Sequence, residues 1–278
     1  PDYHRCYFEY FKRYFVSRSG LKMSRPELQC PPDLFYNEKE AKKYNSSSRM
    51  IEIQAEISSR AIELLALPEG FSGLILDIGC GSGLSGKSLE EAGHVWIGSD
   101  ISRDMLSIAE DRESEAGDLL WQDMGTGLPF RPATFDGAIS ISALQWLCYS
   151  DDKKNDPRKR LARFFSSLYT VLKRTARAAL QFYPANPDQA IMIAQAATKA
   201  GFAGGLVVDY PNSAKAKKFY LCLSFEHSYK VPQALGTSNA GVTVEERQQL
   251  SSKRHHKKGK RRPIKDKDWV MKKKEQQR

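Results

Sequence analysis

Residues Leu74-Ile-Leu-Asp-Ile-Gly-Cys-Gly-Ser-Gly83 decide the fold of this 278-residue chain. The apolar segment 74–78 runs directly into three glycines at alternate positions, and a helical pattern over 84–92 follows. In an open parallel sheet, ligands bind beyond the carboxyl ends of the strands, where the first strand meets its loop. Glycine suits such a loop because a Cβ would keep a ligand away from the backbone, and because only glycine adopts positive φ at little cost. The stretch therefore predicts a strand–loop–helix unit that holds a ligand of nucleotide type.

The same loop admits three interpretations. Gly81, Gly83 and Gly86 satisfy the G-x-G-x-x-G pattern of dinucleotide-binding folds, and a glycine turn without any ligand is a second alternative. Asp77 favours a third, because a carboxylate at the strand end attracts a cationic methionine head group and repels a pyrophosphate. The stretch also resembles motif I of class I S-adenosylmethionine-dependent methyltransferases. That resemblance implies the cofactor S-adenosyl-L-methionine, with five residues at its site: Asp77, Gly79, Cys80, Gly81 and Gly83.

Acidic residues after the next two expected strands extend this cofactor site. Asp100 ends the second strand about 20 residues beyond the glycine loop, where nucleotide-binding folds place an acid that binds the ribose hydroxyls. By resemblance to the same enzymes, Ile101 packs on the adenine, and Asp123 and Met124 contact its amino group and ring. A helix cap or a loop acid is the alternative for Asp123. Ser140, on the fourth expected strand, completes the cofactor candidates.

Strands and helices alternate along the chain, which is the pattern of a doubly wound, mostly parallel sheet. Apolar runs predict seven strands, at 74–78, 95–99, 119–122, 137–141, 178–182, 205–209 and 218–223. Helical periodicity predicts two N-terminal helices, one capped by Asp33 and one at 50–67, and four more at 84–92, 105–111, 157–172 and 187–200. The short connection between the last two strands predicts an antiparallel edge hairpin. The expected fold class is α/β, a Rossmann-like seven-stranded sheet of class I methyltransferase type with N-terminal lid helices.

Charge is distributed unevenly along the chain. Residues 251–278 carry thirteen Lys or Arg and three acids, 13 − 3 = +10, which equals the net charge of the whole chain. Such a tail attracts a polyanion such as RNA, whereas a merely solubilising tail is the alternative. Its lysine and arginine clusters are also typical of nuclear import signals. We expect an N-terminal extension over 1–30, a methyltransferase domain over 31–228, and a basic, largely disordered tail over 229–278.

The composition gives little support to a membrane protein or a metalloprotein. No stretch approaches the roughly 18 apolar residues of a membrane span, so we expect no membrane partner. The five cysteines include no C-x-x-C pair, which argues against a structural zinc site. No metal ligand is therefore assigned.

The loop after the fourth strand faces the methyl group in this fold, so its side chains border the methyl acceptor. The loop contains neither the Asn-Pro-Pro-Tyr type of tetrad that is typical of enzymes methylating exocyclic amines, nor the catalytic cysteine motif of enzymes that methylate C5 of a base. Gln145 offers hydrogen bonds and Trp146 a ring for stacking on a base, although a core tryptophan is the alternative. Tyr183, after the fifth strand, is a candidate for the RNA side. The absence of a general base suits guanine N7, whose lone pair attacks without losing a proton.

Longer motifs give a closer resemblance. They include Pro32-Asp-Leu-Phe-Tyr36, Ser140-Ile-Ser-Ala-Leu-Gln-Trp-Leu-Cys148 and Val208-Asp-Tyr-Pro-Asn-Ser-Ala-Lys-Ala-Lys-Lys-Phe-Tyr-Leu-Cys222, and the last block is far more specific than the glycine loop. Together they resemble the eukaryotic 18S rRNA (guanine-N7) methyltransferases of ribosome biogenesis, over roughly 31–222 and again near Trp269. This sequence departs from the family pattern at Ser82, where many relatives have Thr, and at Trp121-Gln122, where Gly is frequent. The second departure puts the strand edge beside the adenine in doubt.

The resemblance implies a substrate, partners and a location. The enzyme would methylate one guanosine of 18S rRNA in the pre-40S particle, in the nucleolus and nucleoplasm and also in the cytoplasm. A small zinc-binding activator subunit would dock on the third strand, near residues 119–121, as an apolar edge strand also suggests. The lid candidates are Tyr36, Tyr44 and Arg49, and the phosphate-binding candidates are Lys215, Lys217 and Lys218. The alternatives are an assembly scaffold with dispensable catalysis, or a class I methyltransferase acting on tRNA, protein or a small metabolite.

Overall fold

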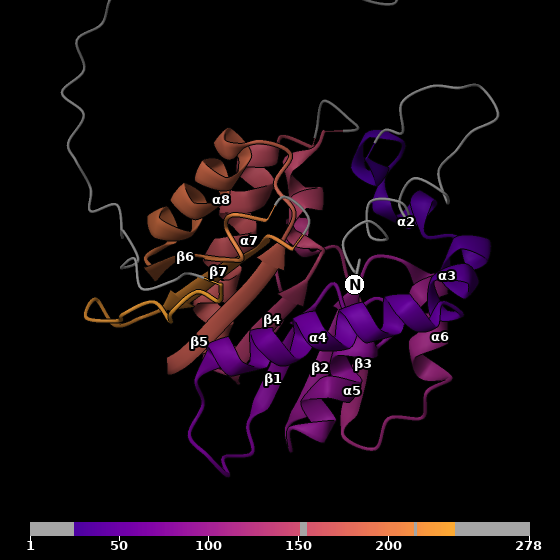
Figure 1. Cartoon of the computed structure of the whole chain (residues 1–278), viewed down its shortest axis with the longest axis horizontal. Helices are drawn as coiled ribbons and strands as arrows, with labels where there is room; N and C mark the ends of the chain where they lie inside the picture. The colour runs from indigo at the N-terminus through magenta and orange to yellow at the C-terminus, as the bar shows by residue number, and fades with distance from the viewer. Residues whose placement is uncertain (1–24, 151–154, 214–215, 237–278) are drawn as a thin grey trace, which may run out of the picture. The chain divides into compact units, whose positions relative to one another are not determined.

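A seven-stranded sheet forms the centre of the chain. The computed structural model describes residues 25–150, 155–213 and 216–236, so residues 237–278 of the expected tail and Lys215 lie outside the described residues. The strand order is β3-β2-β1-β4-β5-β7-β6 (Figure 1). All strand pairs are parallel except those made by β7, which runs antiparallel to both β5 and β6. The expected seven-stranded doubly wound sheet with an antiparallel edge hairpin is confirmed.

The strands begin and end close to their expected positions, with one exception. Their bounds are β1 Leu74–Ile78, β2 Val95–Asp100, β3 Gly117–Trp121, β4 Phe135–Ile141, β5 Leu172–Phe182, β6 Ala203–Asp209 and β7 Lys218–Ser224. β5 begins six residues before the expected residue 178, because Leu172 pairs with Phe135 while the polar run that follows it conceals the strand from hydropathy.

Helices cover both faces of the sheet. The helices are α2 Pro32–Phe35, α3 Glu38–Asn45, α4 Ser48–Leu65, α5 Leu84–Glu91, α6 Arg103–Glu110, α7 Pro157–Val171 and α8 Pro187–Ala200, with 3-10 turns η1 Pro26–Leu28, η2 Met124–Thr126 and η3 Leu144–Cys148. Ile75 packs with α4 and α5 on one face, and its neighbour Leu76 packs with α7 on the other (Figure 1). Successive strand residues therefore contribute to two separate cores.

The N-terminal helical segment differs from the expectation. Asp33 lies inside α2, whose N-cap is Pro31, so the expected Asp33 cap is wrong. The chain leaves helical geometry at Tyr36, and Asn37 then caps α3 by accepting a hydrogen bond from the Glu40 amide at 3.3 Å. An asparagine ahead of a helix is a strong start signal, and here it divides the expected helix into two short ones.

A C-terminal segment, 229–236, packs against α4 and β6 beyond the expected domain end at 228. The buried Arg60 side chain pairs with Asp209 at 3.0 Å and donates to the Gln233 carbonyl at 2.9 Å. The Leu235 amide donates to Asp209 at 2.8 Å, and the Tyr210 amide donates to the Leu235 carbonyl at 2.8 Å. At the other end, Arg25 donates to the carbonyl of Tyr183. The packed chain thus extends past 31–228 at both ends, while the assignments of 1–24 and 237–278 stay predictions.

Neither a membrane span nor a metal cluster is found within the described ranges. No helix there is long and apolar enough to cross a bilayer. The described His, Cys, Asp and Glu side chains also form no group of three that could hold a metal ion.

Candidate active site

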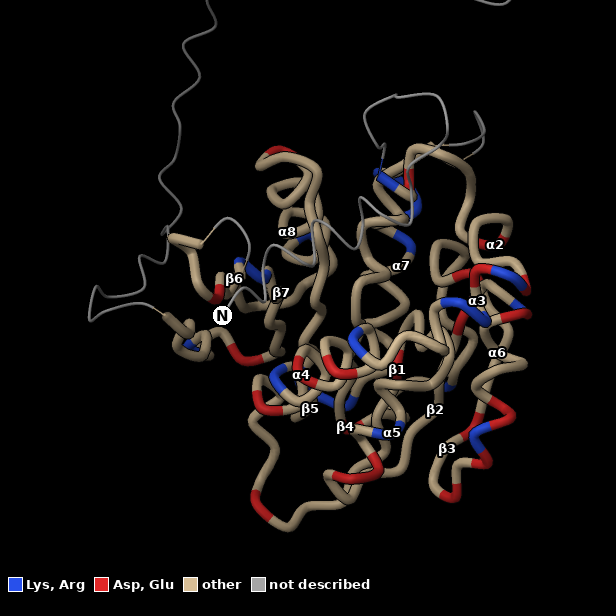
Figure 2. The backbone as a smooth tube through the Cα atoms, turned by 45° about the vertical axis from the view of Figure 1, so that its right-hand side comes forward, with Lys and Arg blue, Asp and Glu red and all other residues tan. Residues whose placement is uncertain are grey.

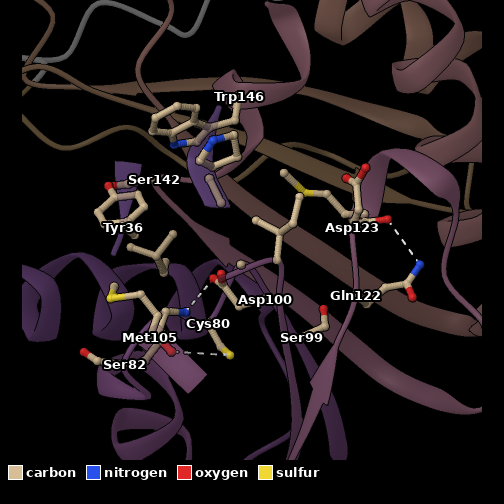
Figure 3. Close-up of a pocket in the computed structure, with 18 of the residues that line it drawn as sticks. Tyr36, Cys80, Ser82, Ser99, Asp100, Met105, Gln122, Asp123, Ser142 and Trp146 are labelled. Atoms are coloured by element: carbon tan, nitrogen blue, oxygen red, sulfur yellow. Dashed lines mark hydrogen bonds between the residues drawn. The ribbon is translucent and has the colours of Figure 1, made fainter. Parts of the chain in front are cut away.

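A pocket opens at the carboxyl ends of β1, β2, β3 and β4. Figure 3 shows Trp146 and Tyr36 on one side of this pocket, Gln122 and Asp123 on the other, and Asp100 between them. Of the thirteen predicted site residues, eight line the pocket: Gly79, Cys80, Gly81, Asp100, Ile101, Asp123, Met124 and Trp146. The remaining five are not part of the lining: Asp77, Gly83, Ser140, Gln145 and Tyr183.

The glycine loop lies against the loop that follows β4. Gly79 has φ +72°, and a Cβ placed on it would be 2.3 Å from the Cβ of Ala143. The Gly79 and Cys80 amides both donate to the Ser99 carbonyl, at 2.7 and 3.1 Å, which joins this loop to the end of β2. Gly86 has a different role, since a Cβ there would be 2.2 Å from the ring of Trp96. The third glycine of the G-x-G-x-x-G pattern is therefore explained by helix–strand packing alone.

Asp77 is a fully buried carboxylate beneath the pocket. One oxygen, Oδ2, accepts a hydrogen bond from the Ser85 hydroxyl at 2.6 Å, and Ser85 itself lines the pocket. The other oxygen, Oδ1, is buried without a hydrogen-bond partner in the described chain. Burial raises the pKa of Asp77 to about 7, opposed by the Ser85 hydrogen bond and assisted by the nearby charge of Asp100. An unpaired buried oxygen is costly, so this position suits a cationic ligand.

Asp100 receives hydrogen bonds from the backbone on both sides of the pocket floor. Its Oδ2 accepts from the Gly81 amide at 2.9 Å, and its Oδ1 accepts from the Ser102 amide at 2.8 Å. Burial raises the pKa of Asp100, and these backbone hydrogen bonds oppose the rise. A carboxylate oxygen accepts two hydrogen bonds, so each oxygen retains capacity for a ligand hydroxyl.

Trp121, in the Trp121-Gln122 stretch that departs from the family pattern, contacts a pocket residue but is not part of the pocket lining. Its side chain is 55% exposed at the sheet edge. The indole Nε1 donates to the Ile101 carbonyl at 2.9 Å, and the Arg103 guanidinium lies over the ring at 3.9 Å. Trp121 at the strand edge thus helps to hold the backbone of Ile101 in place.

Asp123 pairs with an arginine that the sequence did not single out. Its Oδ1 accepts from the Gly125 amide at 2.8 Å and from Arg160 Nη2 at 2.7 Å. The first contact is the helix cap that was the alternative reading of Asp123, here for η2. Arg160 comes from α7 and lines the pocket. No local pattern identifies it, because only the tertiary fold brings α7 across η2.

Aromatic rings from the N-terminal helices meet Trp146 at the pocket. The Tyr36 ring centroid lies 6.0 Å from that of Trp146 and 6.3 Å from that of Tyr44. All three residues line the pocket, whereas Arg49 does not. Trp146 is also only 7% exposed, so it belongs both to the packed interior and to the pocket wall.

The remaining predicted residues hold the loops around the pocket. Gln145 Nε2 donates to the Ser142 carbonyl at 2.7 Å, and Gln145 Oε1 accepts from the Tyr183 amide at 3.4 Å. The Ser140 hydroxyl donates to the Ile78 carbonyl at 2.7 Å, which joins β4 to β1. The sequence reasoning missed Ser142, which lines the pocket with φ +57° and donates to Gln181. A serine carries no sequence signal for this backbone geometry.

The two cysteines near the pocket are protonated thiols. Burial, with the nearby charges of Asp77 and Asp100, raises the pKa of Cys80 well above its usual value. Burial raises the pKa of Cys148 to about 12. Since the thiolate is the nucleophilic form, neither residue is suited to attack a substrate.

Comparison with known proteins now places the chain in a family. It is 54% identical to the mouse 18S rRNA (guanine-N(7))-methyltransferase over 255 residues, which cover 91% of this chain and 90% of the mouse protein. The chain belongs to the 18S rRNA (guanine-N7)-methyltransferase family. The Arabidopsis thaliana and Saccharomyces cerevisiae members are 49% and 53% identical, over 92% and 81% of this chain and 92% and 80% of their own lengths. The expected family is confirmed.

Two family models and two solved structures agree with this membership. Residues 76–180 match a model described as a methyltransferase domain, and 225–278 match one described as a methyltransferase involved in Williams-Beuren syndrome. A TehB-like SAM-dependent methyltransferase from Corynebacterium glutamicum has a TM-score of 0.52 at 17% identity, over 68% of this chain and all of its own. The magnesium protoporphyrin IX methyltransferase from Synechocystis has a TM-score of 0.51 at 16% identity, over 75% of this chain and all of its own. At such identities the likeness shows the fold, which is that of class I methyltransferases.

Proposed function

We propose that this protein transfers a methyl group from S-adenosyl-L-methionine to N7 of a guanosine in 18S rRNA. The observation that carries the proposal is identity of about half of all residues to rRNA (guanine-N7) methyltransferases along most of both chains. The pocket supports the same conclusion, because it combines buried acids for a cationic nucleoside with aromatic walls for a planar base.

The residues of the pocket fit this cofactor. Asp77, with its unpaired Oδ1, would face the methionyl ammonium, with Ser85 between it and the pocket. The backbone of Gly79, Cys80 and Gly81 would lie along the methionine chain, where a side chain on Gly79 has no room. Gly83 and Ser140 would support the glycine loop without touching the cofactor. Gly83 precedes α5, and the Ser140 hydroxyl bonds the Ile78 carbonyl at the end of β1.

The nucleoside end of the cofactor would lie between β2 and η2. Asp100 would accept the ribose hydroxyls, and Ile101 and Met124 would contact the adenine ring. Asp123 would bind the adenine amino group through Oδ2, since Oδ1 already accepts hydrogen bonds from Gly125 and Arg160. Arg160 would thereby fix the orientation of the adenine-binding carboxylate.

The cofactor supplies an electrophilic methyl group on a sulfonium, and the chain supplies alignment. Trp146 and Tyr36 would stack against the guanine and exclude water from the reacting face. Gln145 would position the acceptor loop through Ser142, and it joins that loop to Tyr183 after β5. Guanine N7 carries its lone pair at neutral pH, so alignment of N7 with the methyl group is the main task of these residues.

We further propose a heterodimer with a small zinc-binding activator, acting on pre-40S particles in the nucleus. The half-buried and exposed residues of edge strand β3, with exposed Trp121 at its end, support docking of a partner by sheet extension. A nuclear or nucleolar location agrees with the rRNA named as substrate of the relatives. A scaffold role in assembly can accompany catalysis on the same particle.

The test uses the full chain with its proposed activator, tritiated S-adenosylmethionine and undermodified small subunits. We expect label in 18S rRNA, mapped to one guanine by borohydride–aniline cleavage. Gly79→Glu should abolish the label, because a side chain there meets Ala143, whereas Gly93→Glu at an open position with similar φ should retain it. Absence of label from the unmodified protein, despite measured cofactor binding, would refute the proposal.

A further inference from the structure

The first two turns of α7 carry an unusual excess of positive charge beside the pocket. Arg158, Lys159 and Arg163 are exposed, and they form no ion pair with the described residues. We call these three residues the α7 basic patch. The blue bands in Figure 2 gather on the upper turns of this helix. Arg160, between them in sequence, instead turns inward to Asp123 and the pocket.

Two surface lysines of α3, by contrast, are paired with acids of their own helix. On α3, Lys42 pairs with Glu38 at 2.6 Å and Lys43 with Glu40 at 3.1 Å. Helix α7 contains no acidic residue from Pro157 to Val171. Because α7 has no acidic side chain of its own, the positive charge of the patch is not neutralised within the helix.

The location of these cations is unfavourable for the helix itself. The N-terminus of a helix carries partial positive charge, so basic residues in the first turn reduce helix stability. Asp156 offsets part of this effect as the N-cap, with its side chain accepting from the Lys159 amide at 3.0 Å. A charge arrangement that costs stability is expected at functional positions, and Arg160 of the same helical segment lines the pocket.

The patch lies at the same edge of the sheet as the methyl acceptor. Helix α7 follows β4 and η3, so it begins at the carboxyl edge and runs away from it. Lys159 and Arg163 are one turn apart and therefore neighbours on one side of the helix. The Arg163 side chain passes Gly127, at the end of η2. A polyanion whose base enters the pocket beside Arg160 would therefore extend along this side of α7.

We propose that the α7 basic patch binds the sugar–phosphate backbone of the RNA strand that delivers the target base. The inference rests on the proposed function, because it takes rRNA as the substrate. Phosphate contacts of this kind fix register and supply affinity without reading sequence. The patch would thus orient the strand next to the pocket, separately from any RNA affinity of the C-terminal tail.

The test measures binding of full-length protein to fluorescein-labelled, unmodified 18S rRNA between about 50 and 300 mM salt. The double variant Lys159→Gln/Arg163→Gln should reduce the steepness of log Kd against log salt by about 1.4, at roughly 0.7 per lost contact with single-stranded RNA. The matched control, Arg131→Gln/Lys199→Gln, removes the same charge from the side where the strands begin, since Arg131 precedes β4 and Lys199 lies near the end of α8, just before β6. It should leave the slope close to that of the unmodified protein.

Two further measurements separate the possible failures. Lys159→Arg/Arg163→Lys keeps both charges and should keep the slope, and cofactor affinity by calorimetry should be unchanged in every variant. Equal slopes for the patch and control variants would overturn the proposal, even if the rRNA is methylated. A reduced slope without methyl label in rRNA would support the patch and refute the proposed function.

Discussion

Gly79→Ala tests whether the glycine loop and the acceptor loop share one packed contact. The added Cβ would lie 2.3 Å from the Cβ of Ala143, far inside van der Waals contact, and φ at Gly79 is +72°. The left-handed backbone alone costs about 1 kcal/mol for alanine. Overpacking of this kind adds about 1–3 kcal/mol. We therefore expect a total loss of about 2–4 kcal/mol in the free energy of unfolding.

Gly93→Ala is the matched control for backbone strain. Its φ is +82°, but a Cβ there has no neighbour within 4 Å. We expect this variant to lose only about 1 kcal/mol. The difference between the two alanine variants, measured by urea denaturation, isolates the contact with Ala143. The further change Ala143→Gly removes the opposing Cβ, so the double variant Gly79→Ala/Ala143→Gly should regain most of that difference.

Cofactor affinity provides the second measurement for this prediction. Gly79→Ala displaces the loop that leads to Trp146, so calorimetry should detect weaker cofactor binding, whereas Gly93→Ala should bind normally. Equal unfolding free energies for the two alanine variants would refute the packing argument. The packing argument would also be refuted if the effects of Gly79→Ala and Ala143→Gly on the free energy of unfolding simply added in the double variant, because residues in contact must couple.

Three further predictions concern buried charge and the sheet edge. Burial raises the pKa of Asp77 to about 7, and its ionised form is the one proposed to bind the cationic cofactor, so cofactor affinity by calorimetry should fall roughly tenfold per pH unit below pH 7. Asp77→Asn should bind weakly and show no such slope, and a flat profile for the unmodified protein would contradict the proposed role. Arg60→Met leaves Asp209 buried without its cation and should lower the free energy of unfolding, measured by chemical denaturation, by about 3–5 kcal/mol. Glu63→Gln, which removes the exposed partner of Arg60, should lower it by under about 1 kcal/mol. Equal losses for the two variants would count against the stabilising role of the buried pair. Trp121→Phe keeps an aromatic ring at the sheet edge but removes the indole N–H that bonds the Ile101 carbonyl. The cofactor Kd should rise by about two- to tenfold, with little change in the free energy of unfolding. An unchanged Kd would show that this hydrogen bond does not support cofactor binding.

Local sequence signals were sufficient for the strands and for eight of the thirteen candidate site residues, which line the pocket. The glycine loop and Asp100 lie at strand ends, where chain direction determines what faces the pocket. The same reasoning cannot separate a residue that lines the pocket from one that supports it. Gln145 has the residue type of a binding group, yet its side chain bonds Ser142 and Tyr183.

The missed residues depend on contacts between distant segments. Arg160 reaches the pocket because α7 crosses η2, and the sequence separation of 37 residues from Asp123 leaves no periodic trace. The expected helix from Asp33 failed for a local reason, since Asn37 competes as a cap within the same apolar pattern. Hydropathy also missed the start of β5, because a polar run follows the paired Leu172.

The role predicted for the Trp121 indole would link the outer edge of the sheet thermodynamically to the pocket. It is exposed where another chain can reach it, and it holds the Ile101 carbonyl beside the pocket. A partner on β3 that favours the hydrogen-bonded position of the indole must raise cofactor affinity, and the cofactor must raise affinity for that partner by the same factor. Binding of such a partner and binding of the cofactor would then be coupled equilibria, and each would change the affinity measured for the other.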